Sequence, residues 1–202
     1  MEFDRNVDEP VQDRRVRRSR AALTRAAVAL VTERGTAAVS ITDIAEAADV
    51  SRPVVYQQFG DRDTLLLEAA LDLARHELLA DRTSGVGRDQ ALAAARHFAE
   101  HRVFYRALLT GSCAFALNKG LSGLLVPVNR QIVRQLYGSR LDEGAVDDLA
   151  TYLTGGAAAF INTWLVEAED PLDPEQFADR LMRIMSVLIA GAATSHDLEE
   201  PR

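Results

Sequence analysis

Apolar residues recur at spacings of three and four along almost the whole chain, and this helical period limits the possible folds more than any other feature. Leu23, Ala27, Leu30 and Val31 form one such stripe near the amino-terminal end. No run of alternating β-branched residues indicates a strand. The sequence therefore predicts an all-α fold.

Three helices are predicted in the first third of the chain. Gly35 ends the first, as glycine commonly does at a helix carboxyl terminus. Ser40 and Asp43 resemble a capping box at the start of the second. The expected buried face of that helix contains Ile41, Ile44, Ala45 and Ala48. Ser51 is expected to cap the third helix by accepting a hydrogen bond from a backbone N–H, and Pro53 fits its first turn.

Longer helices are predicted for the rest of the chain. One runs from about residue 63 to residue 80 and ends at the SGVG of residues 84–87. Breaks containing glycine are expected at residues 111–112, 118–120, 138–139 and 144. The last two helices have the clearest apolar faces. The final one opens on Asp173, Pro174 and Gln176, which are a cap, a proline and a capping-box glutamine.

Composition sets the class of protein. With 202 residues, of which 48% are apolar, the chain can bury a core. Its first thirteen residues are acidic and lack the apolar centre of a secretion signal, and no segment approaches the roughly 18 apolar residues of a membrane span. The single cysteine, Cys113, cannot form an internal disulfide and fits a reducing compartment. We therefore expect a cytoplasmic protein with no membrane partner.

Arginine is concentrated near one end, although the chain has a net charge of −7. Residues 14–62 contain nine arginines and five acidic residues, a net charge of +4. Residues 63–202 contain thirteen basic and twenty acidic residues, a net charge of −7. Five of the nine arginines lie in RRVRRSR, at residues 14–20. That segment is either a solvated helix start or disordered arm, or an arm that contacts phosphates.

Residues 51–59, SRPVVYQQF, divide their side chains between two faces of a helix. Val55 and Phe59 lie one turn apart and are expected to face the core together with Val50. The preceding connection, residues 49–51, has the length of a helix-turn-helix corner. The third helix is therefore predicted to enter a DNA major groove. There glutamine can read adenine, arginine can read guanine, and valine or proline can touch a thymine methyl group.

The segment SITDIAEAADVSRPVVYQQFGDRDTLL resembles the DNA-binding signature of the TetR family of transcriptional regulators. The resemblance covers about residues 18–70. The positions that carry it are Ser40, Ile44, Ala45, Val50, Ser51, Tyr56, Phe59, residues 61–63 and Leu65. Two positions depart from the pattern, because Asp49 replaces a turn glycine and Arg62 replaces a lysine. Aspartate tolerates the left-handed backbone better than most residues, and arginine keeps the charge that binds phosphate.

The resemblance implies double-stranded DNA as a partner and a division of the chain into three parts. Residues 1–13 would be a disordered acidic tail, residues 14–62 a helix-turn-helix DNA-binding domain, and residues 63–202 a helical domain for effector binding and dimerisation. The implied DNA contacts are Thr42, Arg52, Pro53, Val54, Tyr56, Gln57, Gln58 and Arg62. The alternative for this set of residues is an ordinary helix face exposed to solvent. Among them, Gln58 lies nearest the boundary between the exposed and the buried face of the helix.

A dimer is expected because a single reading helix contacts too few bases to identify one genomic site. The last two helices contain Gly155 and Gly156, followed by three alanines at residues 157–159, and small residues let helix backbones approach closely. The family commonly dimerises through this pair of helices, which implies a homodimer and a palindromic operator. The same small residues equally fit packing within one chain.

The resemblance also implies a small-molecule effector, held by the helical bundle of residues 85–165. The candidate contacts are Phe98, His101, Phe104, Tyr105, Cys113, Phe115, Tyr152, Phe160, Asn162 and Trp164. Each of them also fits an ordinary place in the core. The aromatic residues favour an apolar or aromatic effector, and no cofactor is expected.

Residues 97–101, HFAEH, satisfy the H-x-x-E-H pattern of inverted zinc peptidases. His97 and His101 share a helix face with Glu100 beside them, but no downstream helix offers an obvious third zinc ligand. Phosphate-loop, di-iron and nucleophile motifs are missing from the sequence, so we expect no enzyme. A metal-sensing regulator that uses these three residues stays open as an alternative.

Two function classes therefore remain. The first is a ligand-responsive regulator, expected to be a repressor, in which the effector shifts the helix of residues 63–80 and changes the spacing of two reading heads. The second is a constitutive or architectural DNA-binding protein whose bundle is filled by its own side chains. A ligand-dependent melting temperature would distinguish the first class from the second.

Overall fold

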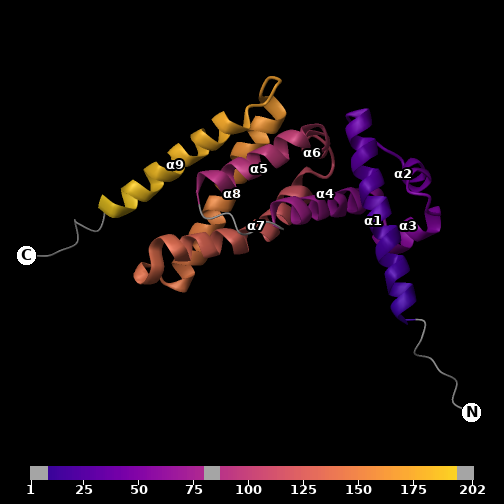
Figure 1. Ribbon diagram of the computed structural model, residues 1–202, viewed down its shortest axis with the longest axis horizontal. Coiled ribbons are helices and arrows are strands. Elements are labelled where there is room, and N and C mark those ends of the chain that lie inside the picture. Colours follow the sequence, from indigo (N-terminus) through magenta and orange to yellow (C-terminus); the bar gives the residue numbers. More distant parts are fainter. Residues whose placement is uncertain (1–8, 80–86, 195–202) are drawn as a thin grey trace, which may run out of the picture. The chain divides into compact units, whose positions relative to one another are not determined.

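The computed structural model describes residues 9–79 and 87–194, with the side chains of residues 13–79 and 87–187. Within them the chain forms nine α-helices, one short 3₁₀ helix and no strand (Figure 1), so the all-α prediction is confirmed. The elements are α1 (Glu9–Arg34), α2 (Ile41–Ala47), α3 (Arg52–Phe59), α4 (Arg62–Leu78), α5 (Arg88–Glu100), α6 (Arg102–Leu109), α7 (Ala114–Tyr137), η1 (Gly138–Arg140), α8 (Glu143–Glu167) and α9 (Pro174–Thr194). None of the described helices is both long and apolar enough to cross a bilayer.

The chain divides into two compact units. The first unit contains Met1–Ala74 and Val103–Leu121, and the second contains Arg75–Arg102 and Ser122–Arg202. The sequence placed a boundary at residue 62, whereas α4 up to Ala74, together with α6, belongs to the first unit. The hydroxyl group of Tyr105 in α6 donates a hydrogen bond to the Ala70 carbonyl oxygen of α4 at 3.5 Å, which joins these segments.

The first helix begins earlier than the sequence indicated. Residues 9–13 were expected within a disordered tail, but α1 starts at Glu9, while residues 1–8 lie outside the described residues. Pro10 suits the first turn because it lacks an N–H that the turn could not use. An ion pair between Arg17 and Asp13, at 3.4 Å and one turn apart, stabilises the turn that follows. At the other end Gly35, with φ +63°, closes the helix as predicted.

One predicted break does not occur. α7 runs without interruption through residues 118–120, because Gly120 serves close packing there and not a turn. A Cβ atom at Gly120 would lie 3.0 Å from both Cδ atoms of Leu71 in α4, so a larger residue would require the Leu71 side chain to move. The breaks at Gly111 and Gly138 occur as expected, and Gly144 lies in the first turn of α8.

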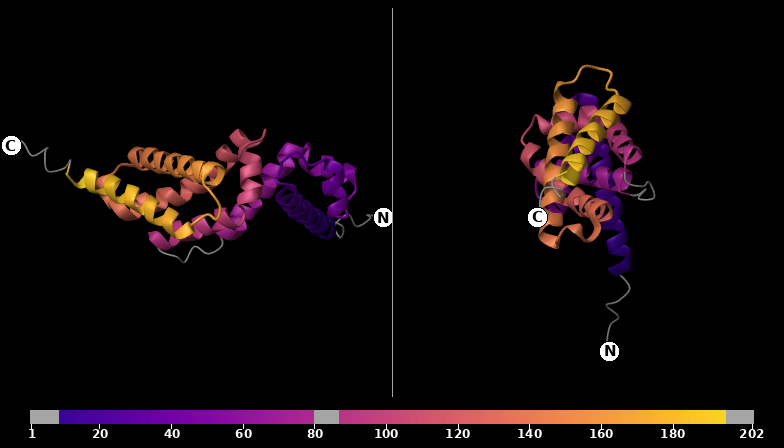
Figure 2. Two further views of the ribbon diagram at one scale, coloured as in Figure 1. Left: turned by 90° about the horizontal axis from the view of Figure 1, so that it is seen from above. Right: turned by 90° about the vertical axis from the view of Figure 1, so that its left-hand side faces the viewer.

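In the second unit α5 lies against both α8 and α9 (Figure 2). α8 begins at its cap Asp142, and Val146 and Ala150 on its inner face pack with Val133 of α7 in one apolar cluster. The carboxylate of Asp173 accepts a hydrogen bond from the Gln176 N–H at 2.9 Å, which confirms the predicted cap of α9.

Candidate nucleic-acid interface

A tight corner joins α2 to α3. The backbone N–H groups of Ala48, Asp49 and Val50 donate to carbonyl oxygens of α2 at 3.0, 3.1 and 2.9 Å. Asp49 has a φ angle of +52°, in the left-handed region that few residues other than glycine, asparagine and aspartate occupy at low cost. The prediction that this aspartate can replace a turn glycine is confirmed.

The start of α2 is capped as predicted. The hydroxyl group of Ser40 accepts a hydrogen bond from the Asp43 N–H at 3.0 Å. The Asp43 carboxylate pairs with Arg34 at the end of α1 and also interacts with Ser40 at the cap. This hydrogen bond from Arg34 lowers the pKa of Asp43 and ties α2 to α1.

α3 has one buried face and one exposed face. Val55 and Phe59 are buried, as predicted, and Val50 before the helix is half-buried. On the opposite face the exposed residues are Arg52, Pro53, Tyr56 and Gln57, with Val54 half-buried beside them. A helix of eight residues thus presents a row of polar and small apolar groups to solvent.

The predicted side-chain cap of α3 is wrong. The Ser51 hydroxyl accepts no hydrogen bond from the first turn, and the Ser51 carbonyl oxygen accepts the Val54 N–H at 3.0 Å instead. A cap side chain normally accepts from the second or third helical residue. Pro53 is the second and has no N–H, and Val54, the third, already has a partner in the backbone.

Gln58 faces α1 and not the solvent-facing row. Its Nε2 donates to the Ser19 hydroxyl group at 2.7 Å, and its Oε1 is buried without a hydrogen-bond partner among the described residues. Gln57, the next residue, is exposed. The two adjacent glutamines therefore have different surroundings, and Gln58 anchors α3 to α1.

Arg20 completes this anchor. Its guanidinium lies 4.5 Å from the centre of the Phe59 ring and pairs with Glu68 of α4 at 3.0 Å. A cation over an aromatic face and a carboxylate partner together hold α1, α3 and α4. Within RRVRRSR, Arg20 is therefore a packing residue, whereas Arg14, Arg15 and Arg18 are exposed.

Four of the predicted DNA contacts line a hollow of about 560 Å³ beside the exposed face of α3. Its lining residues are Val39, Ser40, Ile41, Thr42, Arg52, Tyr56, Asp61, Arg62 and Asp63. Arg62 donates from Nε and Nη2 to one oxygen of Asp63 at 2.8 and 2.7 Å. Ser112 donates to the other oxygen at 2.6 Å, and this bond, against the opposing effect of burial, lowers the pKa of Asp63. Thr42, Arg52 and Tyr56 thus share one concave surface with Arg62.

Residues 23–69 match the family model described as bacterial regulatory proteins, tetR family. The matched segment begins within α1, contains all of α2 and α3, and ends in α4. This segment therefore belongs to the DNA-binding domains of the tetR family. The carboxyl-terminal helices of the chain extend beyond the matched residues, and comparison with curated proteins gives no match.

Solved structures of TetR-family proteins share the fold. A TetR-family protein from Rhodococcus sp. is 20% identical, with a TM-score of 0.61 over 85% of this chain and 98% of that chain. RolR in complex with the ligand resorcinol is 24% identical, with a TM-score of 0.60 over 85% and 89%. The repressor AlkX from Dietzia sp., implicated in biodegradation of n-alkanes, is 21% identical, with a TM-score of 0.54 over 85% and 95%. These likenesses concern the fold.

Four of the effector candidates lie in the first unit. Phe104 and Tyr105 are buried neighbours in α6, with ring centres 5.5 Å apart. Cys113 is buried with its Sγ 3.9 Å from the Asp63 carbonyl oxygen, and burial raises the pKa of its thiol. Phe115, in contrast, is 81% exposed on α7. Only the first three belong to the core, and Phe115 does not line an enclosed pocket within its unit.

The other six candidates lie in the second unit. Phe98 is buried, and Trp164 of α8 stacks on Phe177 of α9 with ring centres 4.3 Å apart. The ring centre of Phe160 lies 5.4 Å from that of the same Phe177. The half-buried candidates are His101, Phe160 and Asn162. Tyr152 is 65% exposed, so its side chain does not line the interior of the second unit.

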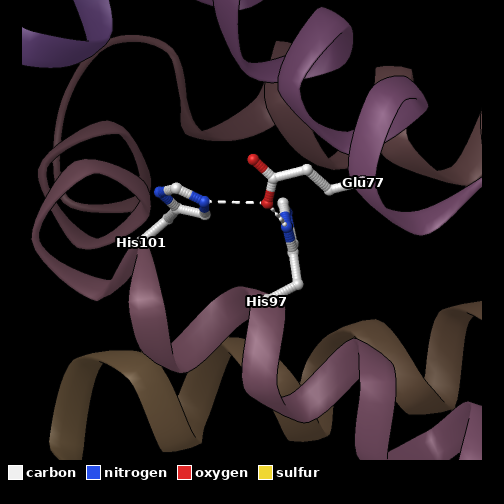
Figure 3. A group of neighbouring side chains, drawn as sticks. All are labelled: Glu77, His97 and His101. Carbon is white, nitrogen blue, oxygen red and sulfur yellow. Dashed lines mark hydrogen bonds and ion pairs between the residues drawn. The ribbon is translucent and has the colours of Figure 1, made fainter.

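The histidines of HFAEH meet a carboxylate, but it is not the predicted one. Oε2 of Glu77, in the last turn of α4, lies 2.7 Å from His97 Nδ1 and 2.9 Å from His101 Nε2 (Figure 3). Glu100 is exposed and lies outside this cluster. Glu77 is twenty residues before His97 and on another helix, so no local sequence pattern could have identified it.

Proposed function

We propose that this TetR-family chain is a ligand-responsive repressor that binds a palindromic operator as a homodimer and is released by a small-molecule effector. The exposed row on α3 carries the DNA-binding half of this proposal. Val55 and Phe59 fix the helix, and Arg20 and Gln58 hold it against α1. A helix fixed from one side leaves its other side available to the bases.

The side chains of the row suit distinct DNA groups. Gln57 can form a bidentate contact with adenine, and Arg52 with guanine. Tyr56 ends in a hydroxyl group that suits a phosphate oxygen, as does the Thr42 hydroxyl in the same hollow. Pro53 and Val54 are placed for a thymine methyl group. We assign Gln58 to the support of the helix and Arg62, despite its pairing with Asp63, to a phosphate.

Large apolar side chains on the outer faces of α8 and α9 support the proposed dimer. Tyr152 is 65%, Ile184 42% and Val187 69% exposed. A Cβ atom at Gly155 or Gly156 would meet no atom within 4 Å, so this part of α8 is bare. Burial of such a surface against a second copy would stabilise the complex by about 25 cal/mol per Å² of apolar area. A closed twofold interface of this kind presents two α3 helices to one operator.

The effector is proposed to bind among the helices of the second unit. The aromatic residues Phe98, Phe160 and Trp164 offer an apolar wall, and Asn162 adds a polar group. Glu77 at the end of α4 belongs to this unit, and Arg62 at the start of the same helix belongs to the first. A shift of α4 could therefore couple the effector to the DNA-binding face, with a coupling energy of about 1–3 kcal/mol.

Selection of bound duplexes from a random pool tests the proposal. A dimer should recover two inverted half-sites whose centres lie about one helical turn apart, and sedimentation at micromolar concentration should give the mass of two chains. An asymmetric single site together with the mass of one chain would contradict the dimeric mode. This experiment would also identify the regulated promoter.

The packing of Trp164 on Phe177 favours one second candidate, a constitutive DNA-binding protein whose bundle is filled by its own side chains. A panel of small aromatic and apolar compounds separates the two candidates. A repressor with an effector should show at least one compound that raises the melting temperature and lowers operator affinity. A constitutive protein should show neither effect with any compound.

A further inference from the structure

We infer that Glu77, His97 and His101 form a binding site for a divalent transition metal ion of the zinc type. The inference does not rest on the proposed function, because it concerns a side-chain cluster within the second unit. Their three ligand atoms, a carboxylate oxygen, His97 Nδ1 and His101 Nε2, all lie within 4.8 Å of one another. Figure 3 shows both imidazole rings directed at one oxygen of the carboxylate.

Two of the three separations between ligand atoms need only a small change to admit an ion. Ligand atoms of a tetrahedral zinc ion lie about 2.0–2.1 Å from the metal and hence roughly 3.3 Å from one another. The two nitrogen–oxygen distances, 2.7 and 2.9 Å, must lengthen by about half an ångström to admit the ion. Glu77 is on a flexible side chain, so its carboxylate can make that movement.

The chemistry of the donors selects the metal. Two imidazole nitrogens and one carboxylate are ligands that suit zinc and its neighbours in the first transition row, whereas magnesium and calcium prefer oxygen alone. Three protein ligands leave a fourth position for water or another ligand, as in open zinc sites. Three protein ligands are therefore typical of an open metal site that can exchange its fourth ligand, whereas a structural zinc site has four protein ligands.

Burial makes the cluster both fixed and accessible. The His97 side chain is 3% exposed and that of His101 19%, while Glu77 is 41% exposed. His97 is thus held by its surroundings, and an ion can enter from the side of Glu77. Because one oxygen faces both rings, each ring donates an N–H to it when no ion is bound, and binding of the metal would require each neutral ring to carry its proton on its other nitrogen.

Zinc titration of the full chain, freed of any polyhistidine tag and dialysed against a chelator, tests the inference. Calorimetry with Zn²⁺ should give one equivalent per chain, and Co²⁺ should show the visible absorption of a nitrogen-coordinated ion. Glu77→Gln preserves the size of the side chain at an exposed position and should weaken zinc binding at least tenfold. His101→Asn should do the same.

Glu100→Gln is the matched control, since it changes the carboxylate of the sequence pattern and leaves Glu77 in place. It should bind zinc as tightly as the wild type. No saturable zinc binding by the wild type, or equal affinity in the wild type and Glu77→Gln, would overturn the inference. Operator selection does not depend on this site, so its outcome and the zinc titration can fail separately.

Discussion

Adjacent glutamines on α3 should behave in opposite ways when each is changed to alanine. Gln57 is exposed, whereas Gln58 donates to Ser19 at 2.7 Å and faces α1. If α3 enters the major groove with its exposed row forward, Gln57 touches a base and Gln58 does not. Gln57→Ala should therefore relax the preference for one base at one position of each half-site.

The magnitudes separate the two variants. A bidentate contact to adenine provides about 1–3 kcal/mol of discrimination, so Gln57→Ala should reduce the preference roughly 5- to 150-fold. Gln58→Ala loses one hydrogen bond worth about 1 kcal/mol, but it also removes the buried Oε1 that has no partner among the described residues, whose burial costs about 1–3 kcal/mol. These effects oppose each other, so folding stability should change by no more than about 2 kcal/mol.

Competition binding at one fixed salt concentration measures the difference. Each position of the selected half-site is replaced by the other three base pairs, and every duplex competes with the parent duplex for each variant. Chemical denaturation of both variants provides the control for folding. The reasoning is refuted if Gln58→Ala relaxes one position while Gln57→Ala leaves every position unchanged.

Three further predictions concern the support of this face and the second unit. Arg62→Ala should weaken binding to all duplexes and reduce the slope of log affinity against log salt by about one; equal slopes would refute its phosphate contact. The Ser112 hydrogen bond, opposed by burial and aided by Arg62, keeps the Asp63 pKa below its ordinary 3.8, so Asp63 stabilises the first unit above that pH. The stabilisation by ionised Asp63 should disappear as the pH falls through the pKa of Asp63 in the folded protein. Denaturation at several pH values should show that Asp63→Asn removes this part of the loss of stability in acid. Buried Arg102 donates to the Leu165 and Ala168 carbonyl oxygens, so Arg102→Met should lower the free energy of unfolding by about 3 kcal/mol; a loss under about 1 kcal/mol in urea denaturation would contradict this role.

The sequence predicted features whose causes lie close together along the chain. The buried pair Val55 and Phe59 follows from helical spacing alone, and the left-handed Asp49 follows from the resemblance to a family that has a glycine at this turn position. The cap of α9 follows from residues within one turn of each other. Each of these depends on no contact with a distant part of the chain.

Features that depend on distant contacts could not be predicted. Gly120 resembles a break until Leu71 of α4 is known to lie against it. A helical wheel places Gln57 on the exposed face and Gln58 nearer its boundary, and only the contact with Ser19 in α1 shows that Gln58 faces inward. The carboxylate that meets His97 and His101 comes from Glu77, across twenty residues, so the adjacent Glu100 was the wrong partner.

Methylation interference on a selected duplex tests most directly the claim that α3 reads the major groove. Dimethyl sulfate modifies guanine N7, which lies in the major groove, and adenine N3, which lies in the minor groove. We predict that methylation at guanine N7 blocks binding in two patches about one helical turn apart, and that Gln57→Ala and Arg52→Ala change the pattern within each patch. Interference confined to adenine N3 would contradict the account, because the protein would then bind through the minor groove.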